Sequence, residues 1–434
     1  MSNKSSTQLA LFADSVASAN KEKEDLSSTF ADNMSLPIHR WFRYTAGFSA
    51  SWVKELIQKT GAKRIIDPFC GSGTVLLESA FAGIEAMGVE AHPYIFRIAS
   101  AKLCWQEDAE EFRHQAKKLL ALAQEIKIEE DTVVPVLIEK CYPLTVRIKL
   151  EALKRAWMTI DVQDYIKELN WFVITSILRL TSPVGTAQWQ YVLPNKSKSN
   201  VIDPFHAFEA KVVQIYQDMK AMQQLHSTPG ATRVYLEDAR NMKSIPDEWA
   251  DLVITSPPYA NNYDYADATR LEMTFWGDVS NWGELHEKVR QYLITACTQN
   301  ISHLERDADA MLNSSLLSPI ASELRDKYVE LSQVRLTKGG KKNYHLMIMA
   351  YFHDLSKVFY ELQRTTQPDA KMCFVIGDSA PYGVYIPVDK WLGELAISAG
   401  FSHYSFEKLR DRNNKWKNRK HTVPLQEGRL WINK

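Results

Sequence analysis

The first regular pattern of apolar and polar positions follows a polar N-terminal stretch. An amphipathic helix is expected over Ala50–Gln58, with Ser49 as its N-cap, because a serine hydroxyl can accept from the free amides of a first turn. Short apolar runs then predict strands at Arg64–Asp67 and Ile84–Glu90, separated by a helix over Val75–Ala82. Strand, glycine-containing loop, helix and strand form the repeating unit of a parallel sheet.

The pattern changes further along the chain. Helical periodicities dominate from residue 91 to about residue 225, for example over Phe112–Lys127 and Val146–Met158. They enclose a polar, aromatic loop at Gln188–Asn200. Sheet elements are then expected to resume, and the predicted later elements are strands at Thr232–Leu236, Leu252–Thr255, Met372–Ile376, Ser402–Leu409 and Gly428–Ile432 and a helix at Val388–Ala399.

These elements predict an α/β protein with a Rossmann-like sheet and a large helical insertion. Residues 1–35 are rich in Ser, Lys, Asp, Glu and Asn and are expected to form a disordered tail. The sheet domain is expected to consist of residues 36–104 and 231–434, with a variable region at about 275–345. Residues 105–230 form the predicted insertion between the two parts.

Composition narrows the function only slightly. The 52 Lys and Arg residues balance the 52 Asp and Glu residues, so any nucleic-acid-binding face must be local. The five cysteines form no CxxC pair, which disfavours a disulfide framework or a zinc site. Neither a signal peptide nor an apolar run of membrane-spanning length is apparent, and we expect a cytoplasmic protein without a membrane or metal partner.

The loop Asp67–Thr74 (DPFCGSGT) lies between a predicted strand and a predicted helix, where doubly wound sheets bind ligands. Gly71 and Gly73 allow the backbone to approach a ligand closely. The loop has no Lys for a phosphate-binding P-loop and lacks the third Gly of a dinucleotide fingerprint.

This loop resembles motif I of amino-methyltransferases, which bind S-adenosylmethionine. The resemblance implies that Asp67 faces the methionine ammonium, that Glu90 binds the ribose, and that Asp238 accepts from the adenine amino group. Phe48 and Ser49 resemble the upstream motif that contacts the cofactor carboxylate. The full set of expected cofactor-binding residues is Phe48, Ser49, Asp67, Pro68, Phe69, Gly71, Gly73, Thr74, Glu90, Ala91 and Asp238.

A second motif, Thr255–Tyr259 (TSPPY), follows the apolar run Leu252–Ile254. It resembles the (D/N/S)PPY motif IV of methyltransferases that modify adenine N6 or cytosine N4. Two prolines fix the backbone, so that the Ser256 hydroxyl and the Pro257 carbonyl can accept hydrogen bonds from an exocyclic amino group. The resemblance implies catalysis by placement, with Tyr259 stacking on the base, and the expected catalytic residues are Ser256, Pro257, Pro258 and Tyr259.

Contacts to the nucleic acid are expected from two further segments. The segment after the catalytic motif supplies the candidate base-edge readers Asn261, Asn262, Tyr263 and Asp264. Arg270 and Glu272 in the same segment are expected to pair with each other on a helix. Phosphate contacts are expected from Lys338–Lys342 and from the basic segment Arg410–His421, through Lys415, Lys417 and Arg419.

The motifs together predict a site-specific DNA methyltransferase of bacterial or phage type, with a restriction-modification setting. Ser256 favours cytosine N4 by resemblance, although a hydroxyl and a carboxylate can both accept from an amino group. Adenine N6, an RNA base amine and a catalytically inactive DNA-binding subunit remain the alternatives. A base within a duplex is inaccessible, so base flipping is expected.

The N-terminal stretch contains one apolar island, Gln8–Phe12 (QLALF). It resembles the short peptide with which bacterial DNA-associated proteins bind the replication sliding clamp. Leu11 and Phe12 could enter an apolar groove while Gln8 supplies orienting hydrogen bonds. The clamp is therefore an expected partner, and association with the nucleoid is the corresponding expected location.

Overall fold

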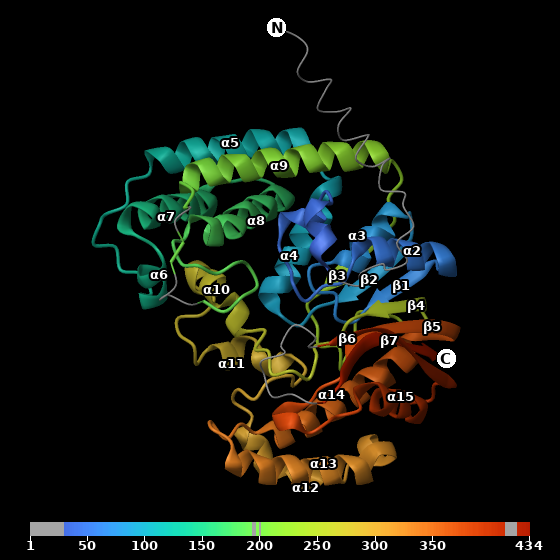
Figure 1. Cartoon of the computed structure of the whole chain (residues 1–434). Coiled ribbons are helices and arrows are strands. Elements are labelled where there is room, and N and C mark those ends of the chain that lie inside the picture. The colour runs from blue at the N-terminus through green and yellow to red at the C-terminus, as the bar shows by residue number, and fades with distance from the viewer. Residues whose placement is uncertain (1–29, 193–196, 199–200, 413–422) are drawn as a thin grey trace.

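The computed structural model describes residues 30–192, 197–198, 201–412 and 423–434. Its centre is a seven-stranded sheet of order β3-β2-β1-β4-β5-β7-β6 (Figure 1). All neighbouring strands from β3 to β5 are parallel, and β7 is antiparallel to both β5 and β6. The strands are β1 Arg64–Asp67, β2 Glu85–Val89, β3 Thr232–Tyr235, β4 Ala250–Thr255, β5 Thr366–Gly377, β6 His403–Arg412 and β7 Leu425–Asn433.

The central strands are apolar on both sides because both faces of the sheet are covered by helices. Ile65 and Ile66 are neighbours in β1, and both are fully buried, but they belong to different cores on opposite faces. Cys373 and Phe374 alternate in the same way in β5. A parallel sheet that is covered on both faces explains why these strands read as continuous apolar runs rather than alternating ones.

One face carries α2 (Ala50–Thr60) and α3 (Thr74–Phe81), and the other carries α14 (Tyr344–Thr365) and α15 (Val388–Ser398). The Ser49 hydroxyl accepts from the Trp52 amide at 3.4 Å, which confirms the predicted N-cap of α2. The helix α4 (Pro93–Leu103) follows β2 and packs against both β3 and the insertion.

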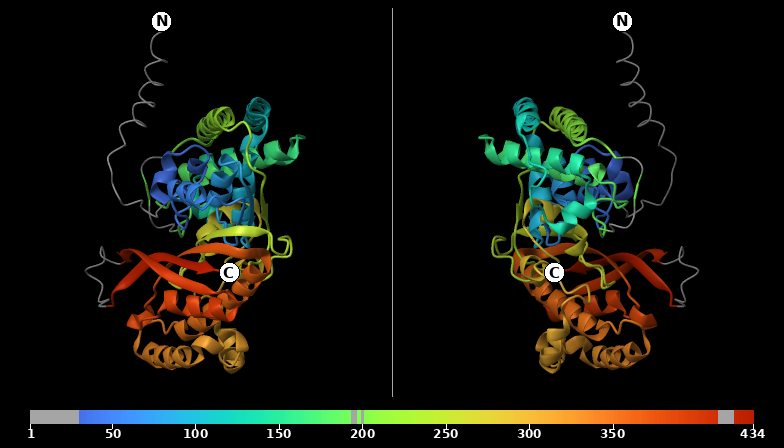
Figure 2. Two further views of the ribbon diagram at one scale, coloured as in Figure 1. Left: turned by 90° about the vertical axis from the view of Figure 1, so that its right-hand side faces the viewer. Right: turned by 90° about the vertical axis from the view of Figure 1, so that its left-hand side faces the viewer.

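The insertion between α4 and β3 is helical, as predicted. Its helices pack around one large apolar core and form a lobe on one side of the sheet (Figures 1 and 2). They are α5 Ala109–Glu125, α6 Val136–Cys141, α7 Leu144–Thr159, α8 Asp164–Thr181 and α9 Pro204–Leu225.

The variable region lies mainly at the opposite end of the molecule (Figures 1 and 2). It contains α12 (Ala308–Leu312) and α13 (Ala321–Val334), which pack against α14. Two further helices, α10 (Arg270–Trp276) and α11 (Leu285–Lys288), lie between this end and the insertion. The two lobes therefore lie on either side of the sheet.

Two expectations differ from the structure. Residues Phe30–Ser35 form a 3-10 helix, and the buried Asn33 side chain donates to the Phe48 carbonyl at 2.9 Å, so this part of the expected tail is structured. Arg270 and Glu272 do not pair with each other. Arg270 forms an ion pair with Asp267, and Glu272 turns into the core toward Arg179 of the insertion.

Candidate active site

A cavity of about 460 Å³ opens at the carboxyl edge of the central strands. Its walls come from the loops that follow β1, β2, β3 and β4, together with residues from the ends of β5, β6 and β7. Parallel strands end at one common edge, so segments that lie far apart in sequence converge there. Both predicted motifs line this one cavity.

Asp67 connects the two motifs directly. Its carboxylate accepts from the Thr255 hydroxyl at 2.7 Å and from the Phe69 amide at 3.1 Å. The side chain is 2% exposed, and burial raises the pKa of Asp67 to about 7 against the opposing effect of these hydrogen bonds. A buried carboxylate at this edge is suited to a cationic ligand.

The glycine loop after β1 packs tightly against an aromatic ring. Gly71 has a φ of +51°, and a Cβ atom there would lie 2.7 Å from the Tyr44 ring. The loop backbone therefore passes close under this ring, which lines the cavity. A side chain at Gly71 would clash with this ring, so glycine is required where the loop passes beneath Tyr44, an arrangement that we call the glycine cradle.

Glu90, which directly follows β2, is hydrogen-bonded to the same loop. Its carboxylate accepts from the Gly71 amide at 3.0 Å and from the His92 amide at 2.8 Å. Burial raises the pKa of Glu90 to about 7, while these hydrogen bonds oppose the shift. Glu90 and Asp67 place two buried carboxyl groups at one end of the cavity, which we call the donor end.

Ser256 lies at the other end, where β4 stops. Its hydroxyl donates to the Val375 carbonyl of β5 at 3.1 Å. A hydroxyl whose proton is committed to a carbonyl offers its lone pairs to other donors. Ser256 can therefore accept a hydrogen bond from an amino group in the cavity.

Tyr259 lies beside a positively charged side chain at this acceptor end. The Arg412 guanidinium is centred 5.1 Å from the Tyr259 ring and donates to the Asp378 carbonyl at 2.7 Å. Arg410 donates to Glu427 at 2.6 Å, and all three charged residues line the cavity. The acceptor end is thus defined by Ser256, Tyr259, Arg410, Arg412 and Glu427.

Most of the predicted site residues meet in this cavity. Those that line it are Phe48, Asp67, Pro68, Phe69, Gly71, Thr74, Glu90, Ala91, Asp238, Ser256, Pro257, Pro258, Tyr259, Asn261 and Tyr263. Ser49 and Gly73 do not line it, because Ser49 caps α2 and Gly73 forms the left-handed start of α3. Lys415, Lys417 and Arg419 lie outside the described residues, as does the clamp-like segment Gln8–Phe12.

Two candidate base readers face away from the cavity. The Asn262 side chain accepts from the backbone amide and the hydroxyl of Thr298, both at 2.8 Å. Asp264 forms a buried ion pair with Arg290 at 2.8 Å and lines a separate cavity of about 320 Å³. Both residues therefore shape the loop, and the structure does not support them as contacts to a base.

Asp238 lines the cavity but already has a partner. Its carboxylate accepts from the Arg240 guanidinium at 2.6 Å, and Arg240 also binds Asp354 at 2.9 Å. This network connects the loop after β3 to α14. A role of Asp238 toward adenine stays a prediction.

Sequence reasoning missed the aromatic side chains that complete the donor end. Tyr44, Trp189 and Tyr265 line the cavity, and Trp189 comes from the helical insertion. Only weak signals preceded them: Trp189 lies in the polar, aromatic loop Gln188–Asn200 and Tyr265 lies in the segment after the catalytic motif, and no motif assigns a role to either.

The remaining expectations concern metals and membranes. Within the described ranges, no cluster of three His, Cys, Asp or Glu side chains is arranged to hold a metal ion. Among the helices of the described chain, none is both long and apolar enough to cross a membrane.

Known proteins resemble this chain in two ways. The family model described as "RMKL-like, methyltransferase domain" matches residues 40–130, which contain Tyr44, Asp67, the glycine loop and Glu90. The type II methyltransferase M.BsoBI of Geobacillus stearothermophilus is 27% identical over 426 residues, covering 88% of this chain and 82% of the relative. M.AvaI of a Nostoc species is 26% identical, with coverage of 86% and 81%, and M.MvaI of Kocuria varians is 21% identical, with coverage of 85% and 83%.

These relatives extend the similarity well beyond the donor end and across both motifs. The strand order, the glycine cradle beneath Tyr44 and the SPPY segment at the end of β4 agree with the same assignment. The comparisons therefore support a methyltransferase similar to the type II DNA methyltransferases, with S-adenosylmethionine as its methyl donor.

Proposed function

We propose that this protein methylates the N4 amino group of cytosine at a specific DNA sequence. The observation that supports methylation of an amino group is the position of Ser256, whose hydroxyl donates to the Val375 carbonyl, and the choice of cytosine rests on the resemblance of the SPPY segment to cytosine-N4 enzymes. A serine in this state accepts hydrogen bonds and is too weak a base to remove a proton. This suits an amino group that needs alignment rather than deprotonation before it attacks.

The chemistry follows from the two ends of the cavity. Bound S-adenosylmethionine supplies an electrophilic methyl group on a positively charged sulfur. The Ser256 hydroxyl and the Pro257 carbonyl accept hydrogen bonds from the two N–H groups of the amino group. These bonds direct the nitrogen lone pair toward that methyl. The new N–C bond forms as the C–S bond breaks, S-adenosylhomocysteine is released, and the amino group loses one proton to water.

Tyr259 provides the face on which the target base stacks. The nearby Arg412 guanidinium restrains the ring from the side of β6. Because the cavity has room for ligands of small-molecule size and not for a duplex, the base must leave the helix to reach Ser256. Site-specific methylation of this kind fits a restriction-modification role in the cytoplasm.

The DNA backbone is expected to approach the same edge of the molecule. Arg410 and Arg412 end the described part of β6, directly before the basic segment that contains Lys415, Lys417 and Arg419. The loop Lys338–Lys342 is exposed, and the Lys342 amide donates to the Tyr382 hydroxyl at 2.7 Å beyond the end of β5. Positive charge on both segments would position phosphates without reading bases.

The decisive experiment identifies the methylated nucleoside. The full chain is incubated with labelled S-adenosylmethionine and either duplex DNA or RNA, and the products are digested and separated. We expect labelled N4-methylcytosine from DNA only. Labelled N6-methyladenine would overturn the choice of base, label in RNA would overturn the choice of polymer, and absence of transfer would support an inactive DNA-binding subunit.

A further inference from the structure

One wall of the donor end comes from the helical insertion and not from the sheet. Trp189 lies in the connection between α8 and α9, is 2% exposed and lines the cavity. Its ring centre is 4.5 Å from that of Tyr44 and 5.9 Å from that of Tyr265. Tyr44 covers the Gly71 cradle, so Trp189 extends an aromatic wall from the cofactor loop toward the catalytic segment.

The backbone at Trp189 adopts a conformation that a bulky residue seldom takes. Its φ is +58°, in the left-handed region that strains a non-glycine residue. Such a conformation persists only when its surroundings enforce it. The Tyr263 hydroxyl donates to the Trp189 carbonyl at 2.9 Å, and the Gln188 side chain binds the Ser176 carbonyl and the Arg43 amide, each at 2.9 Å.

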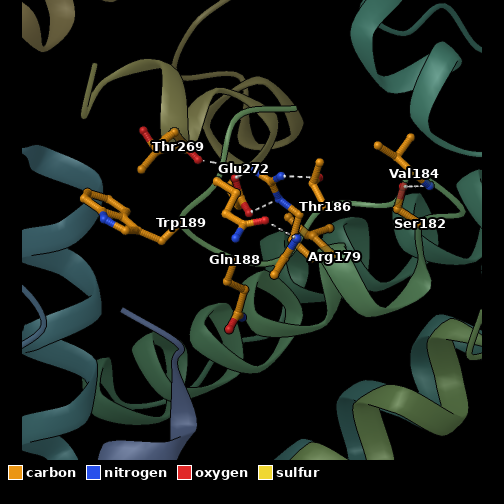
Figure 3. Close-up of polar contacts among 12 residues, drawn as sticks. Arg179, Ser182, Val184, Thr186, Gln188, Trp189, Thr269 and Glu272 are labelled. Carbon is orange, nitrogen blue, oxygen red and sulfur yellow. Dashed lines mark hydrogen bonds and ion pairs between the residues drawn. The ribbon is translucent and has the colours of Figure 1, made fainter. Parts of the chain in front are cut away.

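A buried ion pair joins this connection to the catalytic half of the protein (Figure 3). The Arg179 guanidinium donates to Glu272 of α10 at 2.7 and 3.0 Å, and the two side chains are 3% and 2% exposed. Arg179 also donates to the Thr186 hydroxyl at 2.9 Å and to the Ala268 carbonyl at 3.2 Å. One guanidinium therefore holds α8, the segment that leads to Trp189, and the segment that follows the catalytic motif.

The charge of the donor end defines the ligand that this wall would face. Asp67 and Glu90 are acidic, and the cationic side chains that line the cavity, Arg410 and Arg412, lie at the acceptor end. Aromatic faces attract cations, and they do so more strongly when water is excluded. Carboxylates and aromatic rings together are suited to a positively charged group bound away from solvent.

We propose that Trp189 contacts the positively charged sulfonium of the methyl donor, and that Thr186, Arg179 and Glu272 position it for this contact. The product S-adenosylhomocysteine is a neutral thioether at the same atom, so the aromatic wall should favour the donor over the product. The inference rests on the cavity being the site of methyl transfer and is independent of whether cytosine or adenine is the acceptor.

The first test removes the aromatic face and keeps the apolar bulk. Dissociation constants for S-adenosylmethionine and S-adenosylhomocysteine are measured by calorimetry without DNA, for the parent protein, Trp189→Leu and Trp189→Phe. We expect Leu to reduce the preference for the donor by about 3- to 10-fold and Phe to retain most of it. An unchanged preference in Trp189→Leu would overturn the proposal.

Trp105→Leu is the matched control. Trp105 is also a fully buried tryptophan, and its indole nitrogen, like that of Trp189, has no hydrogen-bond partner among the described residues. It does not line the cavity, so its replacement should leave the ratio of the two dissociation constants unchanged. An equal change of the ratio in both Leu variants would assign the effect to general loosening of the core and would contradict a contact by Trp189.

The second test addresses positioning through Thr186. Thr186→Val keeps the shape but removes the oxygen that Arg179 binds, whereas Thr186→Ser keeps the oxygen. We expect Val to lower the donor preference by about 2- to 5-fold and Ser to restore it, with thermal unfolding measured in parallel. Equal preferences in the two variants would overturn the positioning role. Because all these measurements omit DNA, a wrong choice of base would not affect them.

Discussion

The donor end and the acceptor end of the cavity are built differently, although both lie at one edge of one sheet. The donor end has two buried carboxyl groups, Asp67 and Glu90, fastened by backbone amides and by Thr255. The acceptor end has a neutral hydroxyl at Ser256, the Arg412 guanidinium beside Tyr259, and the ion pair of Arg410 with Glu427. Negative charge thus faces the methyl donor, and positive charge lies where an anionic polymer must arrive.

This difference suggests that the donor end determines the affinity for S-adenosylmethionine and that the acceptor end determines the rate of methyl transfer. Interactions that are present with and without the acceptor contribute to donor binding, whereas interactions that strengthen as the amino group attacks contribute to the rate. Variants at the donor end should therefore change dissociation constants, and variants at the acceptor end should change turnover.

The largest effect is expected from Ser256→Ala. Loss of an acceptor that aligns the attacking nitrogen should lower kcat by about 100-fold or more, by analogy with removal of one preorganised hydrogen-bonding group. Calorimetry should show an unchanged dissociation constant for S-adenosylmethionine. Ser100→Ala, which removes a hydroxyl bound to the Phe96 carbonyl on α4, serves as the control and should retain activity. Equal loss of donor binding and turnover would contradict the separation of the two ends.

Asp67→Asn is expected to weaken donor binding with little effect on turnover, which is the opposite of Ser256→Ala. The amide keeps the size of the side chain but removes the negative charge, so the dissociation constant for S-adenosylmethionine should rise by about 30-fold. Turnover at saturating donor should change much less. Asp251→Asn, at the opposite end of β4 where Asp251 accepts from the Lys63 and Arg64 amides, should leave donor binding unchanged. A kcat defect at saturating donor that matches the affinity defect would show that Asp67 also acts in the chemical step.

The affinity for S-adenosylmethionine, measured as a function of pH, should show the effect of Asp67 and Glu90 in the parent protein. Burial raises the pKa of Asp67 and of Glu90 to about 7, so both carboxyl groups take up protons as the pH falls below neutrality. Affinity for the cationic donor should fall by about 10-fold between roughly pH 8 and pH 6. Calorimetric titration in the absence of DNA measures this, and Asp67→Asn should flatten the profile. A flat profile in the parent protein would contradict the proposed role of these carboxylates.

The raised pKa values of Asp67 and Glu90 also determine how the stability of the folded protein changes with pH. The folded-state pKa values lie above the ordinary values of 3.8 and 4.5, so these groups bind protons more tightly in the folded protein. Their contribution to stability is fully present below about pH 4 and is lost as the pH rises through about 7. Thermal unfolding of the donor-free protein should show this trend, and bound S-adenosylmethionine should oppose it by favouring the charged carboxylates.

Sequence reasoning succeeded where the backbone dictates the chemistry. The glycines of Asp67–Thr74 and the prolines of TSPPY are required by main-chain geometry, and such requirements are visible in a single sequence. The strand positions followed from apolar runs, and β1 was predicted with the bounds that the structure has. The fold class, the methyl donor and the family were predicted in this way.

Sequence reasoning failed where a side chain acts across a long separation. Trp189 meets Tyr44 only because the insertion folds back over the sheet, and the pairing of Arg179 with Glu272 joins residues 93 positions apart. Asp264 is of a residue type that can contact a base edge, but its carboxylate forms a buried ion pair with Arg290. Local pattern carries no information about such partners, because they depend on how separate elements pack.

The smallest effect is expected from Arg412→Met. The unbranched methionine replaces much of the stem that packs near Tyr259 but removes the cation over its ring and the bond to the Asp378 carbonyl. Cation–aromatic contacts of this kind contribute on the order of 1 kcal/mol, so KM for DNA should rise by about 5-fold while donor affinity stays unchanged. Steady-state kinetics with duplex DNA at several salt concentrations measures this, since a guanidinium that also contacts phosphate would change the salt dependence. Arg64→Met, which removes a guanidinium near Trp249 at the opposite edge of the sheet, is the matched control and should leave KM unchanged. A rise in the dissociation constant for S-adenosylmethionine instead would show that Arg412 acts in donor binding, and it would contradict the assignment of Arg412 and Tyr259 to the acceptor end.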